Sequence, residues 1–315
     1  MFWARVGAAA CCLICLMTLQ SLFFAPLKWS LYEPLRVIPQ NLGSLLRPGE
    51  YKRQMIKMQQ EQLRGVELPK LCNMIGTSSV DVFGQDQSYA IFNRLNYKPR
   101  PVFQSYLAYN VPLMRLNEQF YLSPAAPDYV LFALAPIDHK FPPLEDALTL
   151  RCLLINYEPV EAEGPFLLLK AHPKLSIRPN LTLLREGTVQ LGGVIDLKDW
   201  SNDNIWMEIQ VEPTLIGRAR QFFYKGSKLR LAVWKGGQPA KPLRYPAPAP
   251  MLAAGFLASP LLLNRENVMD LYRGKGTTRP TGYSVEAMPG ENGFWSSSVR
   301  FRVYRIANKL DRSPN

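Results

Sequence analysis

The sequence predicts an α+β multidomain protein with an N-terminal transmembrane helix, a small α/β domain with a parallel or mixed sheet, and a C-terminal, jelly-roll-like β-sandwich. Three observations predict this class: an uncharged run of 22 residues near the start, apolar runs that alternate with helix-like stretches in the middle, and alternating segments separated by Gly and Pro after residue 172. The expected parts are a transmembrane anchor (1–27), a juxtamembrane helical segment (28–65), an α/β domain (66–172) and a β-sandwich domain (173–315).

The uncharged run, Val6 to Leu27, is long enough to cross a bilayer. As a helix it would extend about 33 Å, at about 1.5 Å per residue. A cleaved signal peptide and a buried soluble helix are the alternatives. Phe23 and Phe24 stand before Ala25, where a signal peptidase needs small side chains, and this favours an uncleaved anchor. We therefore expect a single N-terminal span with the lipid bilayer as a partner.

The charges that flank this span do not by themselves decide its orientation in the membrane. Arg5 precedes the run while Lys28 and Arg36 follow it, so a strict positive-inside count would place the large part in the cytoplasm. Long C-terminal domains cross membranes regardless of flanking charge, and a longer chain in which this is the last helix would also remove the conflict. We expect the soluble part outside the cytoplasm.

The cysteines and histidines limit the kinds of site that the soluble part can hold. Of five cysteines, only Cys72 and Cys152 follow the apolar run. They would pair in an oxidising compartment, or they are two unpaired buried thiols, and both alternatives stay open. After the apolar run the sequence has no Cys-x-x-Cys motif, and it has only two histidines, His139 and His172, so we expect no metal site and no cofactor.

The segment that follows the anchor contains one expected helix. From Glu50 to Arg64 the spacing places Tyr51, Met55 and Met58 on one helical face among Lys, Arg and Gln. This pattern predicts a helix that lies against the bilayer or the first domain, or else a solvated connector with a narrow apolar stripe.

The α/β domain is predicted from short apolar runs and longer periodic stretches. Buried strands are expected at Leu71–Ile75 and Tyr129–Leu134, helices at Gln85–Arg94, Leu107–Phe120 and Leu144–Tyr157, and a closing strand or hairpin at Pro159–Glu161 and Phe166–Lys170. Strands that alternate with helices favour a small parallel or mixed sheet covered by helices.

The C-terminal part is predicted from alternation with a period of two. Strands are expected at Leu181–Arg185, Trp206–Val211, Arg220–Tyr224, Leu229–Trp234 and Val299–Ile306, with an extended connection at Tyr245–Pro250. In the last strand Arg300, Arg302 and Arg305 interleave with apolar residues, which is typical of a strand with one face in water.

The net charge of +12 is unevenly distributed. Residues 173–315 contain 21 Lys and Arg against 11 Asp and Glu, a balance of +10, whereas residues 66–172 contain 8 against 11, a balance of −3. A positive field on the β-domain would attract anionic lipid headgroups or acidic polysaccharide. We expect a glycan or anionic envelope polymer as ligand, a membrane protein as a further partner, and no nucleic acid, because no recognised nucleic-acid motif is present. A basic surface that only aids solubility is the alternative.

The densest cluster of polar chemistry runs from Asn96 to Asn110, where Pro99 and Pro101 hold the backbone extended around Arg100. A rigid loop that presents Arg, Gln and Tyr side chains would hold a polar or anionic ligand. The candidate ligand-binding residues are Asp81, Asn96, Tyr97, Arg100, Gln104, Tyr106 and Tyr109. In the alternative interpretation Tyr97, Phe103 and Tyr106 pack the loop onto the sheet while Arg100 pairs with Asp81 or Glu145.

The segment Ile75–Ser79 suggests a serine hydrolase as one functional class, because a nucleophile there would directly follow an apolar strand. The segment is loosely similar to the first block of the SGNH esterases, but it lacks their Gly-Asp-Ser, and the chain lacks their late Asp-x-x-His pair. Without a positioned base a serine hydroxyl is a poor nucleophile. Ser78 and Ser79 are adequately explained as turn or helix-capping residues, so no catalytic residue is assigned.

The segments Ser79–Phe83, Asn96–Tyr106 and Leu144–Ala147 together resemble the extracytoplasmic C-terminal part of a group of uncharacterised bacterial multi-spanning membrane proteins. The resemblance covers about residues 70–170 and implies an envelope location without an activity. The arrangement is also distantly similar to the soluble end of lipid-linked-sugar glycosyltransferases, whose catalytic carboxylates lie in loops between membrane helices that this sequence does not contain. We expect a membrane-anchored, non-enzymatic envelope protein with a carbohydrate-binding β-domain. The soluble part of a glycosyltransferase, and a serine hydrolase, are the alternatives.

Overall fold

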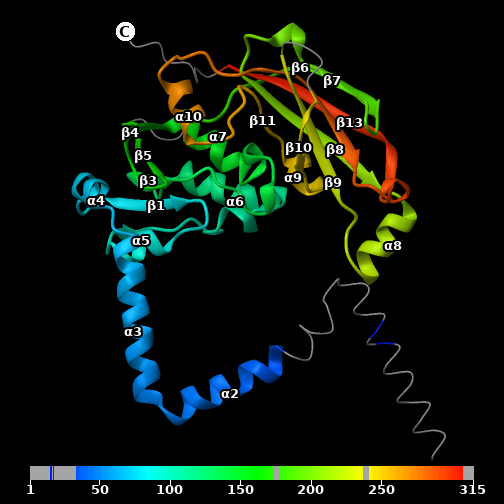
Figure 1. Cartoon of the computed structure of the whole chain (residues 1–315). Helices are drawn as coiled ribbons and strands as arrows, with labels where there is room; N and C mark the ends of the chain where they lie inside the picture. Colours follow the sequence, from blue (N-terminus) through cyan, green and yellow to red (C-terminus); the bar gives the residue numbers. More distant parts are fainter. Residues whose placement is uncertain (1–14, 16, 18–32, 174–176, 237–240, 308–315) are drawn as a thin grey trace, which may run out of the picture. The chain divides into compact units, whose positions relative to one another are not determined.

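The computed structural model describes residues 15, 17, 33–173, 177–236 and 241–307 (Figure 1). It divides into two compact units, Met1–Gly65 and Val66–Asn315. The run from Val6 to Leu27, where a transmembrane helix is predicted, lies outside the described residues except for Cys15 and Met17. None of the described helices combines the length and hydrophobicity that a membrane span requires.

The first unit contains two described helices, α2 (Glu33–Leu46) and α3 (Pro48–Gly65). Helix α3 confirms the helix predicted from Glu50 to Arg64, and none of its residues is buried. Helix α2 exposes Leu35, Ile38 and Leu42, which recur at helical spacing on one side. Contact of these helices with a bilayer stays a prediction.

The second unit begins with a mixed five-stranded sheet in the order β2-β1-β3-β5-β4 (Figure 1). Its strands are β1 (Ser79–Phe83), β2 (Asn96–Tyr97), β3 (Tyr129–Phe132), β4 (Tyr157–Glu163) and β5 (Phe166–Ala171). Strand β1 runs parallel to β2 and β3, while β5 is antiparallel to both β3 and β4. The mixed sheet and the closing hairpin are thereby confirmed.

Helices cover both faces of this sheet because its strands are apolar on both sides. The helices are α4 (Pro69–Ile75), α5 (Ser88–Phe92), α6 (Val111–Tyr121) and α7 (Ala147–Asn156), with short 3₁₀ turns η2 (Ser105–Leu107), η3 (Ile137–His139) and η4 (Pro142–Leu144). Leu131 packs with Leu71 of α4, while its neighbours Val130 and Phe132 pack with residues of α6 and α7. Cys72 and Cys152 are free thiols associated with these two separate clusters.

Two antiparallel four-stranded sheets follow, in the orders β10-β9-β12-β7 and β11-β8-β13-β6. Their strands are β6 (Leu181–Gln190), β7 (Ile195–Asp196), β8 (Ile205–Pro213), β9 (Leu229–Lys235), β10 (Leu243–Pro246), β11 (Phe256–Ser259), β12 (Pro280–Ala287) and β13 (Trp295–Ile306). The connections carry α8 (Leu215–Phe223), α9 (Ala249–Ala254) and α10 (Arg265–Tyr272), with 3₁₀ turns η5 (Lys198–Trp200) and η6 (Asn292–Phe294). Buried side chains from both sheets, such as Ile209, Leu231 and Val303, belong to one core.

That core also extends into the mixed-sheet region. It contains Phe132 and Leu153 as well as the buried residues of the two antiparallel sheets, so it crosses the domain boundary predicted near residue 172. At the junction Arg151 of α7 lies 4.1 Å above the ring of Trp206 on β8, and Trp206 is buried. Helices α7 and α9 thus contact this antiparallel sheet at its strands β11 and β8.

Two predicted strands are wrong because both segments form helices. Leu71–Ile75 belongs to α4, where Pro69 occupies the first turn and Gly76, at φ +57°, ends the helix. A short apolar run does not distinguish a buried strand from a buried helix. Arg220–Tyr224 overlaps α8, whose N-cap Thr214 accepts a hydrogen bond from the backbone N–H of Gly217.

Candidate functional site

The sequence-predicted loop contributes a buried charge cluster instead of a presented guanidinium. Arg100 is fully buried and donates through Nη1 to Asp81 Oδ2 at 2.8 Å and to the carbonyl of Val82 at 2.7 Å. Its Nε donates to Asp146 Oδ2 at 3.2 Å and its Nη2 to Ser105 Oγ at 2.7 Å. Arg100 therefore pairs with Asp81, as one interpretation predicts, and with Asp146 where Glu145 is the predicted partner.

Neutral side chains from two helices complete this cluster. Tyr121 of α6 donates to Asp81 Oδ2 at 2.6 Å, and Asn117 of the same helix donates to Asp146 Oδ2 at 2.8 Å. Thr149 of α7 donates to Asp146 Oδ1 at 2.8 Å. Burial raises the pKa of Asp146 to about 6, although Arg100, Thr149 and Asn117 act in the opposite direction. The cluster ties β1, the Arg100 loop, α6 and α7 together, which is a structural arrangement.

The other predicted ligand-binding residues lie at different depths along the same segment. Asn96 is exposed and donates to the carbonyl of Thr77 at 3.2 Å, while Tyr109 is exposed on the loop. Tyr106 donates to Gln104 Oε1 at 2.7 Å, and both residues are partly buried. Tyr97 is partly buried, and its pKa is raised by burial and by the charge of Asp81. The structure brings Asp81 and Arg100 together, and it keeps both away from solvent.

Ser79, one of the two serines considered as nucleophiles, links the start of β1 to the start of β3. Ser79 Oγ donates to Asp128 Oδ2 at 2.7 Å and accepts from the backbone N–H of Asp128 at 3.0 Å. Asp128 precedes β3, and its hydrogen bonds from Ser79 lower its pKa. The hydroxyl of Ser79 therefore links β1 to the chain that enters β3, as a turn residue does.

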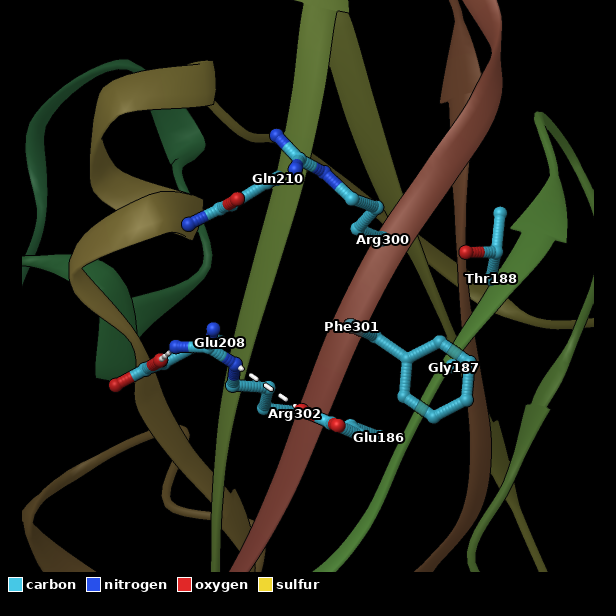
Figure 2. Close-up of a pocket in the computed structure, with 8 residues that line it drawn as sticks. All are labelled: Glu186, Gly187, Thr188, Glu208, Gln210, Arg300, Phe301 and Arg302. Carbon is cyan, nitrogen blue, oxygen red and sulfur yellow. Dashed lines mark ion pairs between the residues drawn. The ribbon is translucent and has the colours of Figure 1, made fainter.

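An open groove lies on the β11-β8-β13-β6 sheet, across the solvent-exposed side chains of β6, β13 and β8 (Figure 2). Its volume is about 370 Å³, and it is lined by Glu186, Gly187, Thr188, Glu208, Gln210, Arg300, Phe301 and Arg302. Along β13 the buried residues Val299, Phe301 and Val303 alternate with Arg300 and Arg302, so the two arginines project from the opposite face. This confirms the solvent-facing side predicted for that strand.

The polar side chains of the groove form loose ion pairs across the strands. Arg302 lies 3.6 Å from Glu186 on β6 and 3.8 Å from Glu208 on β8. Arg300 lies 3.7 Å from Glu212, and more than half of each arginine side chain is exposed. Exposed pairs of this length contribute about 0–1 kcal/mol, so their partners can be exchanged at low cost.

A second hollow adjoins this groove through Gln210, which lines both. It has a volume of about 460 Å³ and is bounded by the end of β8, by Gly217 and Gln221 of α8, by residues of α9 and by Trp295. The Nε1 of Trp295 has no hydrogen-bond partner within the described part of the chain. Together the two hollows extend from β6 across β13 and β8 toward α8.

This surface unites residues that the sequence places far apart. The alternation of polar and apolar residues along one strand indicates that Arg300 and Arg302 face solvent. The partners Glu186 and Glu208 are more than ninety residues away from them, and their positions depend on strand order and register, which a single sequence does not encode locally.

Comparisons with known proteins give only distant similarity. No protein-family model and no curated protein matches the chain. Among solved structures, one described as a structural and functional characterization of Pseudomonas aeruginosa AlgX matches 74% of this chain and 50% of its own, at 12% identity and a TM-score of 0.30. This chain thus corresponds to about half the length of AlgX, and the similarity is too distant to transfer a function.

Proposed function

We propose that the unit Val66–Asn315 binds an extended carbohydrate or anionic envelope polymer in the groove on β6, β13 and β8, and that it does so without catalysing a reaction. The observation that carries the proposal is the open groove itself, which is lined by two arginines, two glutamates, a glutamine and a threonine (Figure 2).

The composition of the groove suits a polyhydroxylated or acidic chain. Sugar hydroxyls both donate and accept hydrogen bonds, and here Arg300 and Arg302 supply donors, Glu186 and Glu208 supply acceptors, and Gln210 supplies both. A guanidinium also binds a sugar carboxylate through two parallel hydrogen bonds. Because the existing ion pairs are long and exposed, a ligand can replace them without leaving a buried charge unpaired.

The charge distribution supports an acidic ligand in particular. The balance of +10 over residues 173–315 raises the local concentration of anions near this half of the unit. The proposal places the protein in the bacterial envelope, tethered by the uncharged run from Val6 to Leu27 with its soluble part outside the cytoplasm. That placement is supported by the length of the run and by the sequence resemblance to envelope proteins.

Polymer binding by matched double variants tests the proposal. The purified protein is titrated with polygalacturonate, an acidic polymer, and with dextran, a neutral one. Arg300→Ala with Arg302→Ala is compared with Arg273→Ala with Lys275→Ala, which removes the same charge at exposed positions outside the groove. Loss of two charge-assisted contacts predicts at least about a tenfold weaker affinity for the groove variant.

The control variant distinguishes binding at the groove from attraction by the overall positive charge of the protein. We expect the Arg273 and Lys275 variant to bind within about twofold of the unmodified protein, because screening weakens charges more than about 10 Å away. Equal losses in both variants, or no loss in the groove variant, would reject the groove as the binding site.

A further inference from the structure

Helix α8 exposes an unusual concentration of large apolar side chains. Leu215 and Phe223 are each 83% exposed, Phe222 is 81% exposed, Ile216 is 68% exposed, and Tyr224 after the helix is 59% exposed. Isolated exposed apolar residues are ordinary on a soluble protein, but contiguous patches mark contact surfaces. We call these five residues the α8 face.

Helical geometry places the α8 face on one side. Leu215 and Phe222 are seven positions apart, as are Ile216 and Phe223. Because seven residues make about two helical turns at about 3.6 residues per turn, the two members of each pair lie on the same side of the helix. The rings of Phe222 and Phe223 also contact each other edge to face, with centroids 5.0 Å apart. The patch is therefore a continuous surface.

The opposite side of α8 is firmly attached to the rest of the unit. Gly217 is buried so closely that a Cβ atom there would lie 2.1 Å from the carbonyl oxygen of Phe294. Arg220 pairs with Glu291 at 3.0 Å and stacks 4.4 Å from the ring of Phe294. Because one side of α8 is packed and hydrogen-bonded, the helix is fixed in an orientation that exposes its other side.

The charged residues within α8 and the turn that follows it are all basic. Between Leu215 and Lys228 the chain carries four basic residues, Arg218, Arg220, Lys225 and Lys228, and no acidic one. Arg218 and Lys225 are exposed next to the apolar side chains. An amphipathic helix with aromatic residues on one face and basic residues at its borders has the composition of an interfacial membrane helix.

We propose that the α8 face inserts into the headgroup region of a bilayer that contains anionic lipid, and so forms a membrane contact separate from the N-terminal apolar run. The phenyl and aliphatic side chains enter the boundary between headgroups and acyl chains, and Arg218 and Lys225 bind lipid phosphates. Each basic residue near such a surface contributes roughly a tenfold or smaller gain in binding.

Charge argues for lipid over a second copy of the chain. In a two-fold dimer through the α8 face the same patch meets itself, so the exposed Arg218 and Lys225 of one copy would be brought close to those of the other. An anionic bilayer neutralises them. The uncharged run from Val6 to Leu27 would in addition keep the unit close to a bilayer, which lowers the affinity that the α8 face needs.

The test uses residues 66–315, because the apolar run would bind vesicles by itself. This part retains the fold: both core clusters lie entirely within it, and no described residue of 33–65 is buried. Flotation is measured with vesicles of phosphatidylcholine alone and with about one quarter phosphatidylglycerol. The variants are Phe222→Ser with Phe223→Ser, and Arg218→Glu with Lys225→Glu. The control is Ile91→Ser with Phe92→Ser, which removes two other exposed apolar side chains.

We expect the unmodified fragment to bind the anionic vesicles, the phenylalanine variant to bind at least about tenfold less, and the control to bind normally. The charge-reversed variant should lose its preference for phosphatidylglycerol. Failure of the fragment to float, or equal binding by the phenylalanine variant and the control, would overturn the proposal. A lipid-free dimer that the phenylalanine variant abolishes would also overturn it and would assign the α8 face to self-association. Thermal unfolding of each variant confirms that the fold is kept.

Discussion

Replacing Arg100 with alanine is expected to destabilise the second unit severely, although Arg100 lies in the segment that most resembles a binding loop. The guanidinium makes four hydrogen bonds, to Asp81, Val82, Asp146 and Ser105, and it is the cation that neutralises two fully buried carboxylates. Breaking a buried ion pair costs about 3–5 kcal/mol because the remaining charge stays buried without compensation. With two carboxylates left, we expect a loss of at least about 4 kcal/mol in the free energy of unfolding at pH 7.

The effect should depend on pH in a definite direction. Arg100 opposes the effect of burial on Asp146, so its removal raises the folded-state pKa of Asp146 further above the unfolded value. The folded variant then binds more protons than the unfolded chain, and its stability falls as pH rises. The loss measured by urea unfolding should therefore be smaller at pH 5 than at pH 7. Adding Asp81→Asn and Asp146→Asn to Arg100→Ala should recover at least about half of it. Arg302→Ala, which breaks only exposed pairs, should cost no more than about 1 kcal/mol. A loss below about 1 kcal/mol for Arg100→Ala at pH 7 would refute the reasoning.

Two further predictions concern single buried positions. Glu145 is 4% exposed and neither carboxylate oxygen has a partner among the described residues, and burial raises its pKa from 4.5 to about 7. Because the pKa of Glu145 is higher in the folded state than in the unfolded state, the free energy of unfolding should fall by about 3 kcal/mol between pH 4.5 and pH 8. Glu145→Gln should remove this part of the pH dependence when urea unfolding is measured at the two pH values. An unchanged pH dependence in the variant would contradict the prediction. Gly217→Val should displace α8 from the Phe294 carbonyl, lower the melting temperature and speed tryptic cleavage at Arg218, whereas unaltered melting and cleavage would mean that the helix is not held there.

Much of the strand content could be predicted because alternation is a local property of the chain. The predicted Val299–Ile306 lies within β13, Trp206–Val211 within β8 and Leu229–Trp234 within β9. In each of these strands one face is buried and the other is more exposed, so side-chain polarity alternates along the sequence. The mixed sheet was also predictable, because strands and helices alternate through that region.

Local sequence pattern failed to predict secondary structure where a helix cap or a buried charge determines it. Strand β1 contains Asp81 among apolar residues, so the sequence does not reveal that Val80–Phe83 are all buried. The burial of Asp81 is tolerated because Arg100 and Tyr121, both distant in sequence, donate hydrogen bonds to it. Helix α8 is indicated by Thr214 as an N-cap, a signal that the alternation of Arg220, Phe222 and Tyr224 obscures.

The candidate sites show the same limit at the level of single residues. Glu145 and Asp146 are adjacent in sequence, and Glu145 is the one predicted as a partner of Arg100. The backbone of Asp146 adopts φ +46° before α7 begins, and this turn directs its carboxylate toward Arg100 and leaves Glu145 without a partner among the described residues. Likewise the groove requires β6, β8 and β13 to be neighbours, which depends on the register of long-range pairing.

The central claim, that the groove on β6, β13 and β8 is the carbohydrate-binding surface, is tested most directly by hydrogen–deuterium exchange with and without a saturating acidic oligosaccharide. We expect slower exchange in residues 181–190, 205–213 and 295–306, with little change in residues 96–110 around Arg100. Slower exchange confined to residues 96–110 would contradict it.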